Sequence, residues 1–140
     1  MKLSTRGKYG LYAMHYLAQH QHEGFQSLNR IASAGIPKQY LEQLLGSLRR
    51  NGLIRSERGA NGGYQLARSP AGITVLDIID AMEGPLALSD CISPDSHCAR
   101  AGQCRVRLVW EKLTDSINHE LAGVTLQDML TSSEVKAIES

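Results

Sequence analysis

The chain has 140 residues, of which 42% are hydrophobic and 21% charged, and its formal net charge is +1. This composition is typical of a soluble globular protein and fits one compact domain with a helical extension. The longest apolar runs are too short for a membrane span and no signal-peptide pattern opens the chain, so we expect a cytoplasmic protein with no membrane partner.

The charges are divided unevenly along the chain. Residues 1–68 hold ten Lys and Arg against three acids, a net of +7, whereas residues 69–140 hold five against eleven, a net of −6. A basic half beside an acidic half indicates a phosphate-binding module joined to a module of another kind. Chance asymmetry is the alternative reading of this feature taken alone.

The first helix is expected from about Lys8 to Gln21. Thr5, Arg6 and Lys8 lie at or just before its start, where they could contact phosphates. Its apolar positions are Leu11, Tyr12, Met14, Tyr16, Leu17 and Ala18. Gly24 interrupts the chain after this helix.

Two short helices with a tight turn between them are predicted next. Ser27 is a suitable N-cap for the first, Gly35 ends it, and Pro37 stands at the start of the second. The second helix has a leucine face at the spacing of a helix packed on a core, namely Leu41, Leu44, Leu45 and Leu48. Its other face is expected to carry Lys38, Gln39, Tyr40, Glu42, Gln43, Ser47 and Arg50. This is the pattern of a helix-turn-helix, whose second helix enters the major groove.

A β-hairpin should follow, with strands at 53–54 and 64–66 and a glycine-rich tip at 58–63. In this tip Arg58 supplies charge, and Asn61 and Gly62 stand beside it. Such a tip can lie close against a phosphate backbone or a minor groove. The alternative is an ordinary solvated helix pair and hairpin.

The acidic half contains three expected helices. Thr74 should cap a helix over 75–83, and Thr125 a short helix within 124–130. Between them, a helix over about 104–121 has an amphipathic stripe made of Val106, Leu108, Val109, Leu113, Ile117 and Leu121. The chain offers little of its own to cover this stripe, so we expect it to pair with a second copy. Such a homodimer would present two recognition helices to a pseudo-palindromic double-stranded DNA operator.

These elements predict a mainly α fold with a small β-hairpin wing. We expect a winged helix-turn-helix DNA-binding domain over residues 1–70. A connecting helix and a cysteine-bearing loop would occupy 71–103, and a long dimerisation helix with a final helix and tail 104–140.

All three cysteines fall within one predicted loop. Cys91, Cys98 and Cys104 have the spacing C-x6-C-x5-C. A structural disulfide is not expected in a cytosolic protein, and the odd count would leave one thiol over. Iron–sulfur ligation is favoured because soft thiolates bind soft cations, and these gaps are wider than the Cys-x2–4-Cys pairs typical of zinc sites. Zinc, a thiol or disulfide redox switch, and no function are the alternatives.

Two other classes of protein agree less well with the sequence. A thiol oxidoreductase is disfavoured because there is no Cys-x-x-Cys beside a βαβ pattern, and no nucleophile–base constellation is apparent, so we expect no enzyme. An adaptor that uses a winged helix only to bind protein is disfavoured by the +7 half.

Taken together, these motifs resemble the iron–sulfur-dependent winged-helix transcriptional regulators of the IscR/NsrR type, and the IscR members most closely. The matching segments are MKLSTRGKYGLYAM, PKQYLEQLLGSLRRNGLI, RGANGGYQLA, ITVLDIIDAMEG and the cysteine loop followed by LVWEKL. The resemblance implies a homodimeric DNA-binding repressor with a cluster held by the three cysteines. It assigns base recognition to Gln39, Tyr40, Glu42 and Gln43, and minor-groove contact to the wing at Arg58, Asn61 and Gly62.

One departure from that pattern concerns the fourth cluster ligand. Members with a [2Fe–2S] cluster have a histidine three residues after the last cysteine, and here that residue is Arg107. Members that sense nitric oxide with a [4Fe–4S] cluster take a carboxylate near the partner's N-terminus, where this chain has Lys8. His97 is the favoured substitute, and Asp95, His15, His119 and solvent remain open. We expect [2Fe–2S] rather than [4Fe–4S].

The resemblance also implies what the regulator controls. We expect it to govern iron–sulfur cluster assembly genes, with the assembly machinery as the cluster donor. A nitric-oxide-sensing cluster repressor and a cluster-free thiol-redox regulator are the alternatives.

Overall fold

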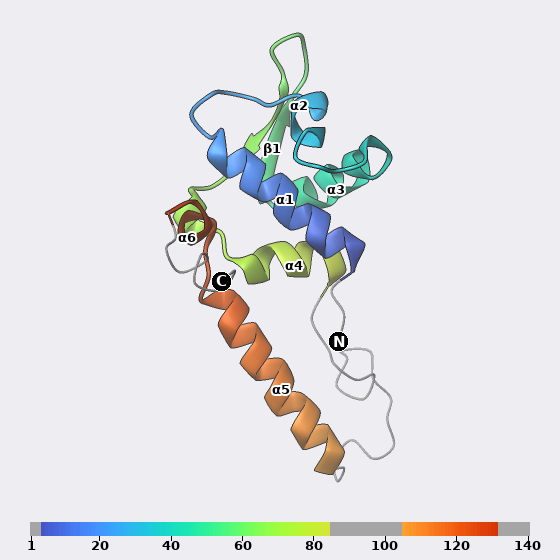
Figure 1. Ribbon diagram of the computed structural model, residues 1–140, viewed down its shortest axis with the longest axis vertical. Helices are drawn as coiled ribbons and strands as arrows, with labels where there is room; N and C mark the ends of the chain where they lie inside the picture. The colour runs from blue at the N-terminus through green and yellow to red at the C-terminus, as the bar shows by residue number, and fades with distance from the viewer. Residues whose placement is uncertain (1–3, 85–104, 132–140) are drawn as a thin grey trace.

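The computed structural model describes residues 4–84 and 105–131 of the chain. In order, its elements are α1 (Thr5–Gln19), α2 (Leu28–Ala32), α3 (Lys38–Arg50), β1 (Ile54–Glu57), β2 (Gly63–Leu66), the 3-10 turn η1 (Pro70–Gly72), α4 (Val75–Glu83), α5 (Arg105–Ala122) and α6 (Leu126–Thr131). The mainly helical fold with a two-stranded wing is therefore confirmed. Figure 1 shows the hairpin at one end of the molecule and α5 extending from the other.

The ends of the helices follow the capping residues of the sequence. The Ser27 hydroxyl accepts a hydrogen bond from the Arg30 N–H at 3.2 Å. Thr74 and Thr125 each begin a capping box, with Asp77 and Asp128 as the respective carboxylate partners. Such caps satisfy N–H groups that have no partner inside the helix. All three predicted caps are confirmed.

The first helix starts earlier than predicted. The Ser4 hydroxyl accepts a hydrogen bond from the Gly7 N–H, so α1 begins at Thr5 and not at Lys8. The Ser4 N–H itself donates to Glu83 Oε1 at 2.6 Å, which ties the start of α1 to the end of α4. Thr5, Arg6 and Lys8 consequently belong to the first turn of α1.

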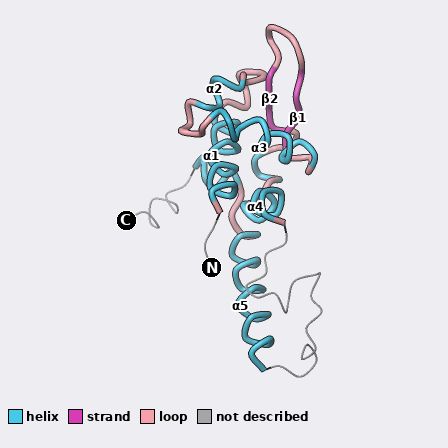
Figure 2. The backbone as a smooth tube through the Cα atoms, turned by 90° about the vertical axis from the view of Figure 1, so that its right-hand side faces the viewer, coloured by secondary structure: helices cyan, strands magenta, loops and turns pink. Residues whose placement is uncertain are grey.

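The hairpin is antiparallel and is anchored to the helices. Ile54 pairs with Leu66 and Glu57 with Gly63. On the other edge of β2, Tyr64 exchanges two backbone hydrogen bonds of 2.8 Å each with Gln26. These bonds attach the hairpin to the segment between α1 and α2. Figure 2 shows the two strands rising beside α2 and α3. The hairpin tip at 58–62 points away from the helices (Figure 2).

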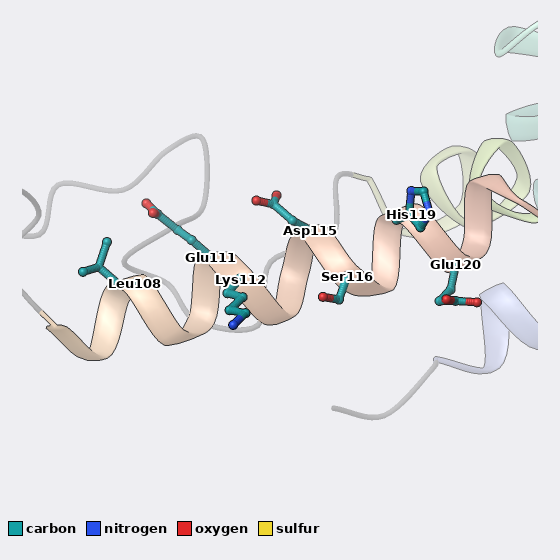
Figure 3. A pocket seen from close by; sticks show the side chains of 7 residues that line it. All are labelled: Leu108, Glu111, Lys112, Asp115, Ser116, His119 and Glu120. Atoms are coloured by element: carbon teal, nitrogen blue, oxygen red, sulfur yellow. The ribbon is translucent and has the colours of Figure 1, made fainter.

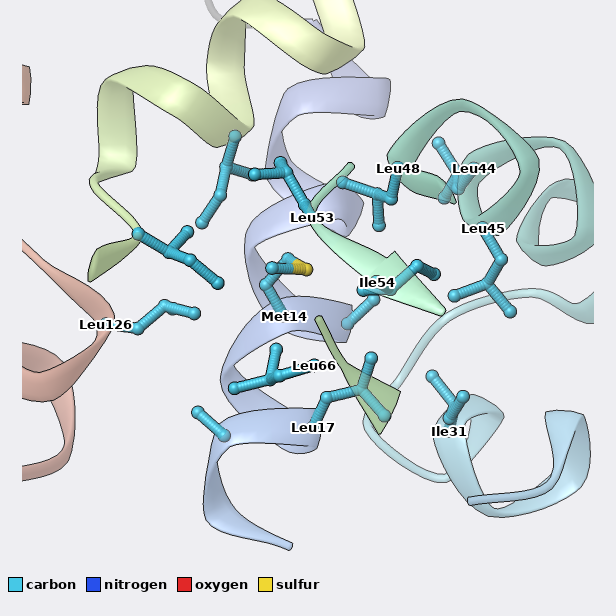
Figure 4. Close-up of a cluster of buried hydrophobic side chains, with 14 of the residues drawn as sticks. Met14, Leu17, Ile31, Leu44, Leu45, Leu48, Leu53, Ile54, Leu66 and Leu126 are labelled. Atoms are coloured by element: carbon cyan, nitrogen blue, oxygen red, sulfur yellow. The ribbon is translucent and has the colours of Figure 1, made fainter. Parts of the chain in front are cut away.

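One buried core joins the elements. Met14 and Leu17 of α1 face Leu44, Leu45 and Leu48 of α3 and the inward residues of the hairpin (Figure 4). Each fully buried side chain of this size contributes about 1.5–3 kcal/mol.

The core continues past residue 70. Ile73, Ile78 and Met82, and Leu126 from α6, belong to the same buried cluster. A short bridge holds α6 in place, because the Val75 N–H donates to the Val124 carbonyl at 2.8 Å. Residue 70, which lies in η1, is therefore not a boundary between separate cores, and α4 and α6 support α1 from below (Figure 1).

Candidate nucleic-acid interface

The outward face of α3 is a row of exposed polar side chains. Leu41, Leu45 and Leu48 are fully buried, so the opposite side of the helix faces solvent. The exposed residues of this row are Lys38, Gln39, Tyr40, Glu42, Gln43, Arg49 and Arg50. The arrangement provides amide, carboxylate and guanidinium groups, the chemistries that recognise base edges and phosphates.

Ser47 is the exception among the predicted residues of this face. Its prediction as an outward residue is wrong, because only 6% of Ser47 is exposed. Its hydroxyl accepts hydrogen bonds from Arg6 Nη2 and Arg50 Nη2, each at 3.0 Å. A direct contact from Ser47 to a base is therefore not expected.

The first turn of α1 lies against α3. Thr5 and Arg6 share with Tyr40 and Gln43 the wall of a hollow of about 250 Å³. The rings of Tyr9 and Tyr40 are stacked, with centroids 6.4 Å apart. The sequence did not predict this stack or the hydrogen bond between Arg6 and Ser47, because each contact joins residues more than thirty positions apart.

Lys8 and Ser27 also lie on exposed parts of this region. Lys8 Nζ is 5.8 Å from the centre of the Tyr12 ring, a cation–π distance that leaves the ammonium accessible. Ser27 is exposed while it caps α2. Contacts from these two residues to DNA remain predictions.

The wing tip presents Arg58 and Asn61 to solvent. Gly62 has a different role, since a Cβ at this position would lie 2.1 Å from the Glu57 carbonyl oxygen. Its N–H donates to the Gly59 carbonyl at 3.1 Å, closing the turn. Gly62 is thus required by the hairpin itself, and a role in approaching DNA is an additional prediction.

The predicted cluster ligands Cys91, Cys98 and Cys104, together with His97 and Asp95, lie outside the described residues. Within residues 4–84 and 105–131, no group of three or more His, Cys, Asp or Glu side chains could hold a metal ion. Arg107 forms an ion pair with Glu111, its Nε lying 2.8 Å from Oε1. His15 of α1 lines a hollow together with Tyr16 and His20, the residue that follows the helix.

The helix α5 has two unlike sides. Its polar side lines an open hollow of about 640 Å³ and bears His119 next to Asp115 (Figure 3). On another side Val106, Val109 and Leu113 follow at spacings of three and four residues, and they are 58%, 54% and 44% exposed. In the ranges that the structure describes, no helix combines the length and the apolar character needed to cross a bilayer.

Comparison with known proteins agrees with this geometry. The family model Rrf2, described as iron-dependent transcriptional regulator, matches residues 3–132. A putative helix-turn-helix regulator, ORF2 of Azotobacter vinelandii, is 40% identical over 97% of this chain and 83% of its own length. The solved structure of IscR from T. potens has a TM-score of 0.75 at 45% identity, covering 93% of this chain and 86% of that one. CymR, the global cysteine regulator of Bacillus subtilis, has a TM-score of 0.75 at 38% identity, covering 94% and 99%.

Proposed function

This chain belongs to the Rrf2 family of transcriptional regulators, and we propose that it is a homodimeric DNA-binding repressor controlled by an iron–sulfur cluster. As a helix-turn-helix transcriptional regulator, it is not an enzyme. The finer assignments, namely the repression, the cluster and the genes controlled, are the proposal.

The exposed row on α3 is the observation that carries DNA binding. Gln39 and Gln43 would read adenine through bidentate amide contacts, and Glu42 would accept from cytosine N4. The Arg58 guanidinium of the wing would enter the adjacent minor groove, where it would recognise the width of the groove and its negative potential. Lys38, and Thr5 and Lys8 of α1, would fix the register on phosphates.

The apolar stripe on α5 supports dimerisation. Val106, Val109 and Leu113 are large apolar side chains exposed on one face of an 18-residue helix. Burying them against the same stripe of a second copy would remove that surface from water. A two-fold axis along this contact would present both α3 helices to a pseudo-palindromic operator.

Three thiolates are a donor set that fits an iron–sulfur cluster. Cys91, Cys98 and Cys104 would hold it, and the assembly machinery would supply it. Arg107 is engaged with Glu111 and is no iron ligand, which leaves His97 as our choice for the fourth position. We favour [2Fe–2S] over [4Fe–4S], and iron–sulfur assembly genes as the targets.

The position of the cysteine segment explains how its state could reach the DNA. Residues 85–104 join the end of α4 to the start of α5 in the chain, so a change in this segment would act on both helices. From α4, the hydrogen bond between Glu83 and Ser4 leads to the first turn of α1, which lies against α3. A ligand that differs in affinity between two positions of these helices shifts their equilibrium.

Anaerobic purification tests the cofactor. A visible absorption spectrum with iron and sulfide analysis should give a coloured protein with near-equal iron and sulfide. Operator selection from random duplexes, with cluster-loaded and cluster-free protein, tests DNA recognition separately. A protein that stays colourless after anaerobic reconstitution would contradict the cluster and leave DNA binding untouched.

A cluster-free thiol regulator is the second candidate. Its support is the structural match to CymR, whose description is that of a global cysteine regulator. It predicts that mild oxidation changes operator affinity reversibly in iron-free protein. A nitric-oxide response is the third, and it predicts loss of operator binding when cluster-loaded protein meets nitric oxide.

A further inference from the structure

Two arginines from different helices converge on one buried hydroxyl beside the recognition helix. Arg6 lies in the first turn of α1, and Arg50 is the last residue of α3. One Nη2 of each donates to Ser47 Oγ at 3.0 Å. The two nitrogens are therefore at most about 6 Å apart, since both touch the same oxygen.

This cluster lacks a negative charge. In the part of the chain that the structure describes, neither Arg6 nor Arg50 pairs with a carboxylate. Ser47 Oγ already accepts two hydrogen bonds, so what remains to the hydroxyl is its own proton, a donor. Two guanidinium groups and this proton make a site of donors only, which is complementary to an anion with several oxygens.

The cluster also lies beside the side chains that face outward from α3. Counted along the helix, Gln39, Gln43, Gly46 and Arg50 are four, three and four residues apart and share one face. Arg50 Nη1 would be 3.3 Å from a Cβ built on Gly46. The guanidinium of Arg50 thus lies close to Gly46 on this face.

Arg6 approaches the same face from α1. It lines the 250 Å³ hollow together with Gln43 and Tyr40. The two arginines consequently stand next to the residues that would read bases, at a place where a phosphate could be held and the base row still left open.

We propose that Arg6 and Arg50, positioned by Ser47, form a clamp for one backbone phosphate of the operator in each half-site. This inference rests on the proposed DNA-binding function and adds a specific anchor to it. The chemistry recognised is a phosphate group with two free oxygens. We assign it to DNA because the clamp adjoins Gln39 and Gln43 on one exposed face.

The test is a double-mutant cycle in which one change removes a charge from the protein and the other neutralises one phosphate of the DNA. The selected operator is synthesised with one uncharged methylphosphonate at a time, and affinity is measured by fluorescence anisotropy with the full chain and with Arg6→Gln. One phosphate in each half-site should cost about tenfold when neutralised, a typical value for one charged hydrogen bond. Arg6→Gln should cost about as much, and the two changes together should cost clearly less than the product of the two separate losses.

Three further variants separate charge from position. Arg50→Gln should be less sensitive than wild type to neutralisation of the same phosphate that Arg6→Gln identifies. Both should reduce the slope of log affinity against log salt by about one. Ser47→Ala keeps both charges and should lower affinity without changing that slope. Lys112→Gln on α5, which removes one charge far from α3, should behave as wild type.

The possible outcomes distinguish failure of the clamp from failure of the proposed DNA-binding function. A wild-type chain that selects no operator would overturn the proposed function, and the clamp with it. If, at every phosphate, the affinity loss from neutralisation simply multiplied with the loss from Arg6→Gln, no phosphate would depend on Arg6. That result would overturn the clamp and leave the proposed function standing. Stabilisation of DNA-free wild type, but not of Arg6→Gln, by inorganic phosphate at constant ionic strength would identify a free-anion site and overturn the assignment to DNA.

Discussion

Gly10 of α1 lies so close to Met82 of α4 that a Cβ at Gly10 would be 2.6 Å from Met82 Cγ. Met82 is buried, so it cannot swing away into solvent. The missing side chain at Gly10 therefore lets α1 and α4 approach closely at this point.

Gly10→Ala should destabilise the protein by about 1–3 kcal/mol, the usual cost of overpacking a well-filled contact. Urea unfolding followed by the fluorescence of Trp110 and by circular dichroism would measure it. Gly72→Ala is the matched control, because a Cβ there meets nothing within 4 Å. Equal stability of the Gly10 variant and wild type would show that the helices separate freely.

Asp80 on α4 predicts a pH dependence of stability. Partial desolvation of this exposed side chain, and then the neighbouring Asp77 carboxylate, raise the pKa of Asp80 above its ordinary value of 3.8. Ionised Asp80 therefore disfavours the folded state at neutral pH, whereas below pH 3.8 the group is protonated in both states. Asp80→Asn should be more stable than wild type at pH 7, and the gain should shrink as the pH falls toward 4. A gain that is constant with pH would point to packing and not to charge.

Arg58→Ala tests the wing. We expect affinity for the operator to fall about tenfold and the salt slope to decrease by about one, because one phosphate or minor-groove contact is lost. The dimer should stay intact, since Arg58 lies at the hairpin tip, remote from α5 (Figure 1). Lys112→Ala controls for the change in net charge. Unchanged affinity at moderate salt would rule out the wing contact.

Val109→Glu tests the dimer. A carboxylate in the exposed apolar stripe would be buried without a partner on association, so the variant should sediment as a folded monomer. Its operator affinity should drop with the loss of the second α3. Leu108→Glu is the matched control, because Leu108 lines the polar side of α5 (Figure 3) and its variant should remain dimeric. Dimers in both variants would place the contact elsewhere.

Cys98→Ala tests the cluster. We expect loss of bound iron and sulfide together with an altered operator preference, because two remaining thiolates should not hold the cluster. Elemental analysis after anaerobic reconstitution measures the first and binding to selected operators the second. Ser96→Ala in the same segment should keep its iron. A Cys98 variant with full iron content would exclude this cysteine as a ligand.

Local patterns were sufficient for most of the fold. The leucine face of α3 and the caps at Ser27, Thr74 and Thr125 depend on spacings of a few residues, which the sequence displays directly. The early start of α1 was missed because Ser4 is one cap among several polar residues near the N-terminus. The hairpin was correctly expected, although its strands are 54–57 and 63–66.

The side of an amphipathic helix on which a given residue lies was less predictable. Ser47 reads as a surface residue because serine is small and polar, yet α1 covers it. Leu108 reads as part of the apolar stripe of α5, yet it lies with Glu111 and Asp115 on the polar side (Figure 3). Helical spacing fixes which residues share a face, but only the packed neighbours fix what that face meets.

The sequence by itself determined the winged helix-turn-helix, the basic half and the cysteine motif, because each rests on residue type and short spacing. Only the tertiary structure decided that Arg6 and Arg50 meet at Ser47, that Tyr9 stacks on Tyr40, and that α4 and α6 complete the core. These contacts join residues far apart in the chain. They exist because burial of apolar side chains from several helices brings their polar neighbours together, and no single segment contains that information.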